Sequence, residues 1–164
     1  MNNQKNIVLC GVGGQGTVLA SKLLAAAAMS KDIPVMSAET IGMAQRGGSV
    51  FSHLRMGDNL YSPMIETGTA DLLIGFEPGE TVRMLPYLKD HGHIVVSTRA
   101  VKPVTATLSG SDYDAPQMLE YLKAAVPNLT LVNADQACAD IGSSKVLNTS
   151  WRSHTDRSTG LYNL

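Results

Sequence analysis

Cysteine is scarce in this 164-residue chain, which contains only Cys10 and Cys138. Two thiols so far apart cannot supply a disulfide framework, a metal knuckle or the four ligands of an iron–sulfur cluster. We therefore expect free thiols in a reducing compartment, which indicates the cytoplasm.

Long apolar runs are also missing: none approaches the roughly 20 residues that cross a bilayer. The N-terminal residues show no signal-peptide core, so we expect no membrane or secreted form.

Neither acidic nor basic residues are in clear excess. The chain has 13 basic and 14 acidic residues, a formal net charge of −1, and no long run of either sign. This balance argues against nonspecific nucleic-acid binding and against attachment to anionic lipid. The 44% of hydrophobic residues is ordinary for a globular protein, and the length fits one domain.

Short apolar runs alternate with helix-forming segments along the chain. We predict strands at residues 6–10, 35–39, 49–56, 70–76, 93–97 and 129–133. We predict helices at residues 17–29, from about 78, at 115–126 and from 135 to about 141. This alternation is typical of a Rossmann-like α/β domain with an open, mostly parallel sheet and helices on both faces.

Three local features carry finer expectations. Leu19, Leu23 and Ala27 are spaced four residues apart, and alanine and leucine are strong helix formers, so this segment is predicted to be a helix. The turn at residues 57–59 suggests a hairpin that returns through residues 60–62. The helix that starts near Pro78 is expected to turn its apolar side inward. Those inward residues are Val82, Leu85 and Leu88.

A glycine-rich hexapeptide lies between the first predicted strand and the first predicted helix. It reads Gly11-Val12-Gly13-Gly14-Gln15-Gly16 and matches the pattern G-x-G-x-x-G. Gly11 and Gly13 are expected to adopt positive φ, and Gly16 is expected to let helix and strand pack closely. The helix N-terminus behind it offers free N–H groups and a partial positive charge, which favour an anion.

A dinucleotide-binding site is one interpretation of this turn. It requires an acidic residue at the end of the second strand to hold the ribose hydroxyls. Glu39 stands at that position. An independent NAD-dependent dehydrogenase using Gly11, Gly13, Gly16 and Glu39 therefore remains open, although the chain lacks a second domain for a substrate. A tight turn with no ligand, in a pure assembly module, is the third possibility.

A second unusual segment reads Ala44-Gln45-Arg46-Gly47-Gly48-Ser49-Val50. Its adjacent glycines suggest backbone held close to a neighbour, and the Arg46 guanidinium suits a carboxylate or phosphate. We expect this loop to face the first glycine turn. The predicted ligand-contacting residues are the following: Gly11, Gly13, Gly14, Gln15, Gly16, Gln45, Arg46, Gly47 and Gly48.

With both motifs in this order, the chain resembles the small subunit, gamma or beta, of 2-oxoacid:ferredoxin oxidoreductases. Further support comes from Ser62-Pro63, Ala70-Asp71-Leu72-Leu73, Glu77-Pro78 with Glu80, and Lys145-Val146-Leu147-Asn148. The resemblance covers residues 5 to about 148. It is greatest to the indolepyruvate oxidoreductase beta subunit, and pyruvate and 2-oxoglutarate versions remain possible.

The resemblance implies a subunit that is inactive alone. The complete enzyme oxidatively decarboxylates a 2-oxoacid, forms an acyl-coenzyme A and reduces ferredoxin through iron–sulfur clusters. Thiamine diphosphate and the clusters belong to a large partner subunit, and this chain contributes an interface and contacts to coenzyme A. No catalytic residue or metal ligand is assigned to this chain, and the isolated subunit could form homo-oligomers.

The end of the chain departs from the family pattern. We expect a gamma-type α/β domain over residues 1–148 and an atypical polar tail over residues 149–164. Elsewhere His53 is expected to be structural. Glu77 and Glu80 are explained by the dipole at a helix start, although the same sheet edge could also meet a ligand.

Overall fold

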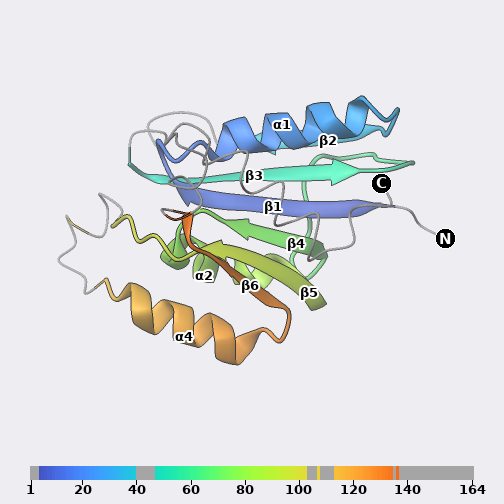
Figure 1. The fold of residues 1–164 in the computed structure, drawn as a ribbon. Coiled ribbons are helices and arrows are strands. Elements are labelled where there is room, and N and C mark those ends of the chain that lie inside the picture. Colours follow the sequence, from blue (N-terminus) through green and yellow to red (C-terminus); the bar gives the residue numbers. More distant parts are fainter. Residues whose placement is uncertain (1–3, 40–46, 103–106, 108–112, 135, 137–164) are drawn as a thin grey trace.

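The computed structural model describes residues 4–39, 47–102, 107, 113–134 and 136. Ten elements follow one another along these residues (Figure 1). They are β1 (Lys5–Val12), α1 (Thr17–Met29), β2 (Val35–Glu39), β3 (Ser49–Met56), β4 (Ala70–Gly75), α2 (Pro78–Met84), the 3-10 helix η2 (Leu85–Tyr87), β5 (Leu88–Ser97), α4 (Ala115–Ala125) and β6 (Leu129–Val132).

The strands form one six-stranded sheet in the order β2-β3-β1-β4-β5-β6. Strand β3 runs antiparallel to both of its neighbours, β1 and β2. The remaining pairs, β1 with β4, β4 with β5 and β5 with β6, are parallel. The predicted open, mostly parallel sheet is thus confirmed, and it contains one antiparallel strand.

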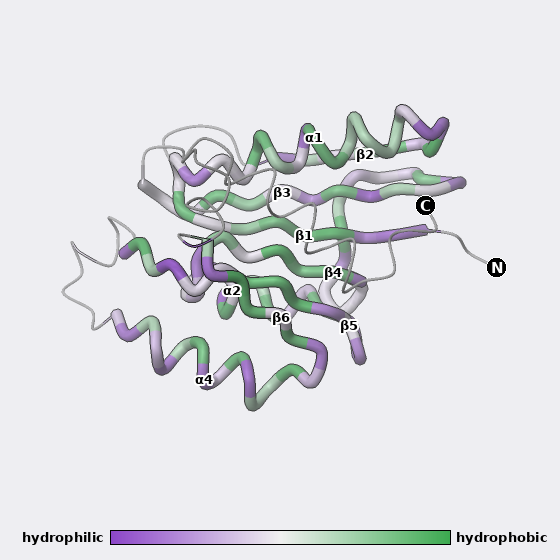
Figure 2. The backbone as a smooth tube through the Cα atoms, in the orientation of Figure 1, coloured by the Kyte–Doolittle hydropathy of each residue, from purple (hydrophilic) through white to green (hydrophobic). Residues whose placement is uncertain are grey.

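Helices cover both faces of this sheet. Figure 1 shows α1 on one side, next to β2 and β3, and α2 and α4 on the other. The side chains of β1 alternate accordingly: Ile7 and Leu9 join the core on the α1 side, and Val8 and Cys10 join the core on the α2 side. The strong hydrophobic colouring of β1, β4 and β5 in Figure 2 reflects this two-sided burial.

The chain changes direction between β1 and β4. From β1 it continues through α1 to β2 at one edge, and from β4 it continues through β5 to β6 at the other. The carboxyl ends of the parallel strands therefore lie at one edge of the sheet, where open α/β folds bind ligands. Among the described residues no helix combines the length and apolarity required to span a bilayer.

Several local expectations were wrong. Residues 60–62 form no strand, because β3 pairs instead with β1 and β2 on either side. Helix α2 ends at Met84, and Leu88 already begins β5. Pro86 cannot donate an amide to a continuing helix, which explains the short 3-10 turn there. Val82, Leu85 and Leu88 nevertheless pack against the core, so their predicted inward direction is confirmed. The predicted helix at 135–141 lies almost entirely outside the described residues.

The orientation of α1 is decided by the structure. Leu19 and Leu23 are 51% and 44% exposed, so they do not form the inward face. The buried residues of α1 are small or hydroxylated: Thr17, Ala20, Ser21 and Ala28. Helical spacing alone does not decide which of two apolar faces meets the sheet, since in α1 both faces are apolar.

Candidate functional site

Three loops meet at the carboxyl edge of the sheet and are joined by hydrogen bonds. The Gly13 amide donates to the Gly48 carbonyl at 2.8 Å, which connects the two motifs predicted to face each other. The Ser49 hydroxyl donates to a Glu80 carboxylate oxygen at 2.5 Å. The two glycine motifs and the start of α2 therefore form one hydrogen-bonded unit.

Gln15 fixes the shape of the glycine turn. Its side-chain oxygen accepts from the Val12 amide at 2.7 Å, and its side-chain nitrogen donates to the Phe76 carbonyl at 3.1 Å. The Phe76 amide in turn donates to the Cys10 carbonyl at 2.8 Å. These bonds close the crevice between β1 and β4, so the Gln15 side chain is used within the protein. Contact of Gln15 with a ligand stays a prediction.

The glycines of the turn have roles different from those expected. Gly14 and Gly16 are the ones with positive φ, at 98° and 84°. Gly11 instead provides the close packing, because a Cβ there would lie 2.9 Å from the Gln15 and Thr17 side-chain oxygens and from Phe76. The first glycine of the motif is thus tightly packed, and Gly14 and Gly16 supply the left-handed conformation. Close packing of helix and strand at Gly16 stays a prediction.

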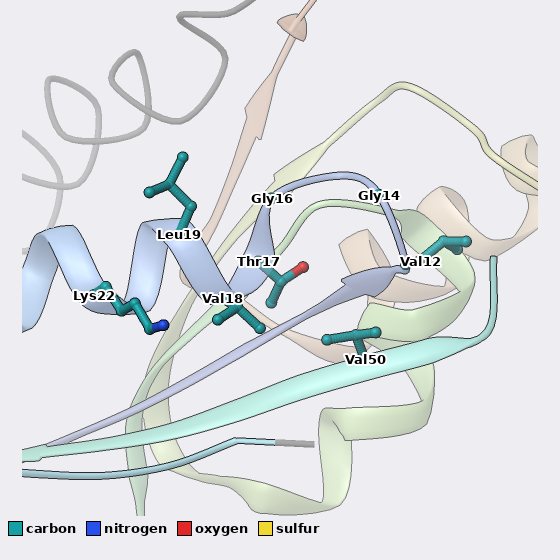
Figure 3. Close-up of a pocket in the computed structure, with 9 residues that line it drawn as sticks. Val12, Gly14, Gly16, Thr17, Val18, Leu19, Lys22 and Val50 are labelled. Carbon is teal, nitrogen blue, oxygen red and sulfur yellow. The ribbon is translucent and has the colours of Figure 1, made fainter. Parts of the chain in front are cut away.

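A cavity of about 510 Å³ opens beside the N-terminus of α1. Its walls combine the turn, the first turns of α1 and one residue of β3 (Figure 3). The lining residues are Val12, Gly13, Gly14, Gly16, Thr17, Val18, Leu19, Lys22 and Val50. Three predicted site residues, Gly13, Gly14 and Gly16, line this cavity, and the sequence reasoning missed Thr17 and Lys22.

The N-terminus of α1 carries no side-chain cap. Its N-cap residue is Gly16, and no acidic residue occupies the first turn. The first amides of a helix have no intrahelical acceptor, and among the described residues no hydrogen bond to the amides of Thr17 and Val18 is found. These amides, together with the helix dipole, make the cavity suitable for an anionic group.

The Thr17 and Lys22 side chains add polar groups to the backbone amides of this cavity. The Thr17 side chain is 2% exposed, and its hydroxyl has no hydrogen-bond partner among the described residues. Figure 3 shows it beneath the arch of the glycine turn. The Lys22 side chain lines the cavity, is exposed and forms no ion pair within the described part of the chain.

A buried carboxylate lies on the α2 side of the same edge. Glu77 is completely buried, and one carboxylate oxygen accepts from the Glu80 amide at 2.9 Å as the N-cap of α2. Burial raises the pKa of Glu77 to about 6, partly offset by hydrogen bonds from the amides of Glu80, Gly79 and Val101. The predicted structural role of Glu77 at the helix start is confirmed.

Cys10 and His53 are buried and have structural roles. Burial raises the pKa of the Cys10 thiol far above its ordinary value, so this thiol is no thiolate ligand or nucleophile. His53 is buried, and its Nδ1 accepts from the Ile65 amide at 3.2 Å. Phe51 and Tyr87 contact the His53 ring edge to face. Burial lowers the pKa of His53, which keeps it neutral and structural.

The structure describes the other predicted site residues only in part. Gln45 and Arg46 lie outside the described residues, so their contact with the cavity stays a prediction. Gly47 has a φ of 80°, and Gly48 forms the bond to Gly13 already described. Within the described residues no group of three or more potential metal ligands occurs, and Cys138 lies outside them.

Topology disfavours the dinucleotide interpretation. In dinucleotide-binding domains the second strand lies directly beside the first, which brings its terminal acidic residue next to the glycine turn. Here β3 separates β2 from β1. Glu39 therefore lies two strand spacings from β1, about 10 Å away. Glu39 is thus poorly placed to hold a ribose whose phosphates are bound at the Gly11–Gly16 turn.

Comparison with known proteins identifies the family. The family described as Pyruvate ferredoxin/flavodoxin oxidoreductase matches residues 6–151. The indolepyruvate oxidoreductase subunit IorB of Archaeoglobus fulgidus is 39% identical over 139 residues, which are 84% of this chain and 69% of that protein. The same subunit of Methanothermobacter thermautotrophicus is 35% identical over 87% of this chain and 73% of its own length.

Solved structures share the fold. The gamma subunit of a keto/oxoacid ferredoxin oxidoreductase from Geobacter sulfurreducens superposes with a TM-score of 0.59 at 22% identity, over 89% of this chain and 70% of that one. The 2-oxoglutarate:ferredoxin oxidoreductase of Magnetococcus marinus, solved with 2-oxoglutarate, coenzyme A and succinyl-CoA bound, superposes with a TM-score of 0.61 at 18% identity. That match covers 88% of this chain and 22% of the other. The fold, the family match over most of the chain and the identity to these subunits together establish that this chain belongs to the pyruvate ferredoxin/flavodoxin oxidoreductase family.

Proposed function

We propose that this chain is the small subunit of an indolepyruvate-type 2-oxoacid:ferredoxin oxidoreductase. The single observation that carries the proposal is the 39% identity to an indolepyruvate oxidoreductase subunit over 84% of the chain. Gamma subunits of pyruvate/ketoisovalerate oxidoreductases are more distant, at 28% identity or less. Indolepyruvate is therefore the preferred substrate of the proposed complex, ahead of pyruvate.

The chemistry of the complex belongs to a large partner subunit. Thiamine diphosphate there would supply decarboxylation, and iron–sulfur clusters would carry the electrons to ferredoxin. The residues of this chain fit that division, because Cys10 is buried with a raised pKa and cannot serve as a cluster ligand. The free thiol of Cys10 also suits a cytoplasmic location. Residues 1–148 would form the gamma-type domain, with residues 149–164 as its atypical tail.

This chain contributes contacts that bind coenzyme A and supplies no reacting group. The amides at the start of α1 and the cavity beside them would receive a phosphate group of coenzyme A, and Arg46 from the neighbouring loop would add a guanidinium. Three observations support this assignment: the uncapped N-terminus of α1, the cavity of about 510 Å³, and the bond that holds Gly48, two residues after Arg46, against Gly13. A phosphate at a helix N-terminus is stabilised by the dipole and by direct N–H donors.

The function is tested by co-expression with a large subunit of an indolepyruvate oxidoreductase from the same genome. The purified complex should reduce ferredoxin with indolepyruvate only when coenzyme A and both subunits are present. Pyruvate and 2-oxoglutarate, assayed in parallel, should be poorer substrates. A large subunit that is fully active without this chain would contradict the proposal.

The coenzyme A contact is tested separately in the same complex. Arg46→Ala should raise the KM for coenzyme A about ten-fold or more, the scale of one lost charge-assisted phosphate contact, while the KM for the 2-oxoacid stays constant. Lys123→Ala is the matched control, because Lys123 is an exposed cation on α4, on the opposite face of the sheet. Equal coenzyme A dependence in the two variants would refute the Arg46 assignment.

A further inference from the structure

Helix α1 presents three large apolar residues to the outside. Leu19, Leu23 and Met29 are 51%, 44% and 58% exposed. The fully buried residues of α1 are small or hydroxylated, and Leu24 is the one leucine of the helix that packs against the core. Figure 3 shows the Leu19 side chain directed away from the sheet. A helix that packs on a sheet normally has the opposite arrangement, with large apolar residues inside and charged residues outside.

Helix α4, on the other face of the sheet, follows the normal arrangement. Its Leu122 is completely buried, and its outer side carries Glu120 and Lys123 in an ion pair. In α1, by contrast, Lys22 is the only charged residue among 13. A helix that is apolar on all sides is characteristic of burial on both sides, so the outer side of α1 requires a cover.

We define the α1 outer face by its exposed residues: Leu19, Lys22, Leu23, Ala26 and Met29. Two of these residues, Leu19 and Lys22, also line the cavity, whose walls continue with Val18 and Val50. The apolar surface therefore extends from the outer face into a hollow. Contiguous exposed apolar surface of this kind marks interaction sites.

The charge on this face indicates what covers it. Lys22 lies between Leu19 and Leu23 near the middle of the helix, and it has no ion-pair partner within the described residues. Helix α1 itself carries no acidic residue. While the cavity holds no anion, a cover that buries the leucines must therefore place a negative group opposite Lys22, because an unpaired buried charge is costly.

A second copy of the chain does not meet this requirement. Two copies that packed their outer faces about a two-fold axis would bring the central Lys22 of one copy close to Lys22 of the other. Like charges at that position would repel each other. The acidic group must therefore come from a surface different from this one.

We propose that the α1 outer face docks the large subunit of the same enzyme, through an apolar segment that carries a carboxylate opposite Lys22. This inference rests on the proposed function. It is consistent with the Magnetococcus enzyme, in which the region of this fold makes up 22% of one longer chain and is thus one part of a larger protein.

The test uses the co-expressed complex with an affinity tag on the large subunit. Leu23→Glu and Lys22→Glu should each reduce the amount of this chain that co-purifies by at least about ten-fold, the scale expected when a central apolar or charged contact is lost. The matched controls are Tyr121→Glu and Lys123→Glu on α4, where Tyr121 is 54% exposed. The controls should co-purify like the wild-type chain.

Each outcome has a definite meaning. Wild-type amounts of the Leu23→Glu and Lys22→Glu chains in the complex would overturn the inference. So would the conversion of a wild-type dimer of this chain into a monomer by Leu23→Glu with the complex intact, because the cover would then be a second copy. A large loss of thermal stability in the isolated Leu23→Glu chain would show that the α1 outer face is covered by the chain itself. That outcome would also contradict docking of the large subunit. If the wild-type chain captures no large subunit at all, the proposed function fails instead.

Discussion

The Gly13 amide donates a hydrogen bond to the Gly48 carbonyl, with 2.8 Å between nitrogen and oxygen. These residues are distant in the sequence, and each lies in one of the two glycine-rich motifs. Their bond explains why both motifs occur in one chain: the loop before β3 is held against the turn after β1. The residue that holds the other side of this turn, Gln15, provides the first prediction.

Gln15→Leu should lower the free energy of unfolding by about 1–3 kcal/mol. The substitution removes the Gln15 bonds to the Val12 amide and the Phe76 carbonyl, and a buried amide left unpaired costs about 1–3 kcal/mol. Urea denaturation of the full chain measures the change. Gln117→Leu on the exposed side of α4 is the control and should have little effect. A stability equal to that of the control would show that Gln15 does not hold the turn.

Two glycine substitutions should differ in severity for different reasons. A Cβ on Gly75 would lie 1.7 Å from the Thr81 hydroxyl oxygen, so Gly75→Ala should destabilise by on the order of 3 kcal/mol or prevent folding. Gly14 has open space around it but a φ of 98°, so Gly14→Ala should cost only about 1–2 kcal/mol of backbone strain. Thermal melting of both variants checks the order, and the reverse order would contradict the packing at Gly75.

Thr17→Val should raise the free energy of unfolding of the chain by about 1 kcal/mol, because it removes a buried hydroxyl that has no partner among the described residues. Thr81→Val is the matched control. The Thr81 hydroxyl is also buried, but it donates to the Glu77 carbonyl at 2.7 Å, so its loss should destabilise by about 1 kcal/mol. Urea denaturation measures the free energy of unfolding of both variants. If Thr17→Val lowered it as Thr81→Val does, the Thr17 hydroxyl would have a partner.

Glu77 should make the stability depend on pH in an unusual direction. Its pKa rises from 4.5 in the unfolded chain to about 6 in the fold, because burial penalises the carboxylate. A group with a raised folded-state pKa contributes stability that is complete below pH 4.5 and is lost as the pH rises through about 6. The free energy of unfolding that is lost over this pH range amounts to about 2 kcal/mol.

Glu77→Gln removes this titration and retains an oxygen that can cap α2. The variant should therefore match the wild-type chain near pH 4 and exceed its free energy of unfolding by up to about 2 kcal/mol at pH 7.5. Urea denaturation at several pH values gives the difference between the two chains, in which the opposite contribution of His53 cancels. A difference that is constant with pH would show that Glu77 does not titrate in this range.

Local sequence patterns predicted most of the fold because they report directly on secondary structure. Helix α1 begins and ends where its alanine- and leucine-rich run does, at Thr17 and Met29. Pro78 begins α2 as expected of a proline at the first helical position. The motif G-x-G-x-x-G likewise located the turn at the carboxyl edge of the sheet, since it identifies a strand followed by a helix.

The features that the sequence did not predict depend on contacts between residues far apart in the chain. The sequence could not show that β3 pairs between β1 and β2, which separates Glu39 from the glycine turn. It could not show that Lys22 lines the cavity, because a single lysine in an apolar helix gives no local signal.

The amino-acid order by itself determined the elements, their α/β alternation and an anion-suited helix N-terminus, because these follow from periodicity, propensity and backbone freedom over a few residues. Only the tertiary structure decided which side of α1 meets the sheet. Both sides are apolar, and close packing on β3 and β1 selected the small residues Ala20, Ser21 and Ala28. That choice turned Leu19 and Leu23 outward, where an interface can use them.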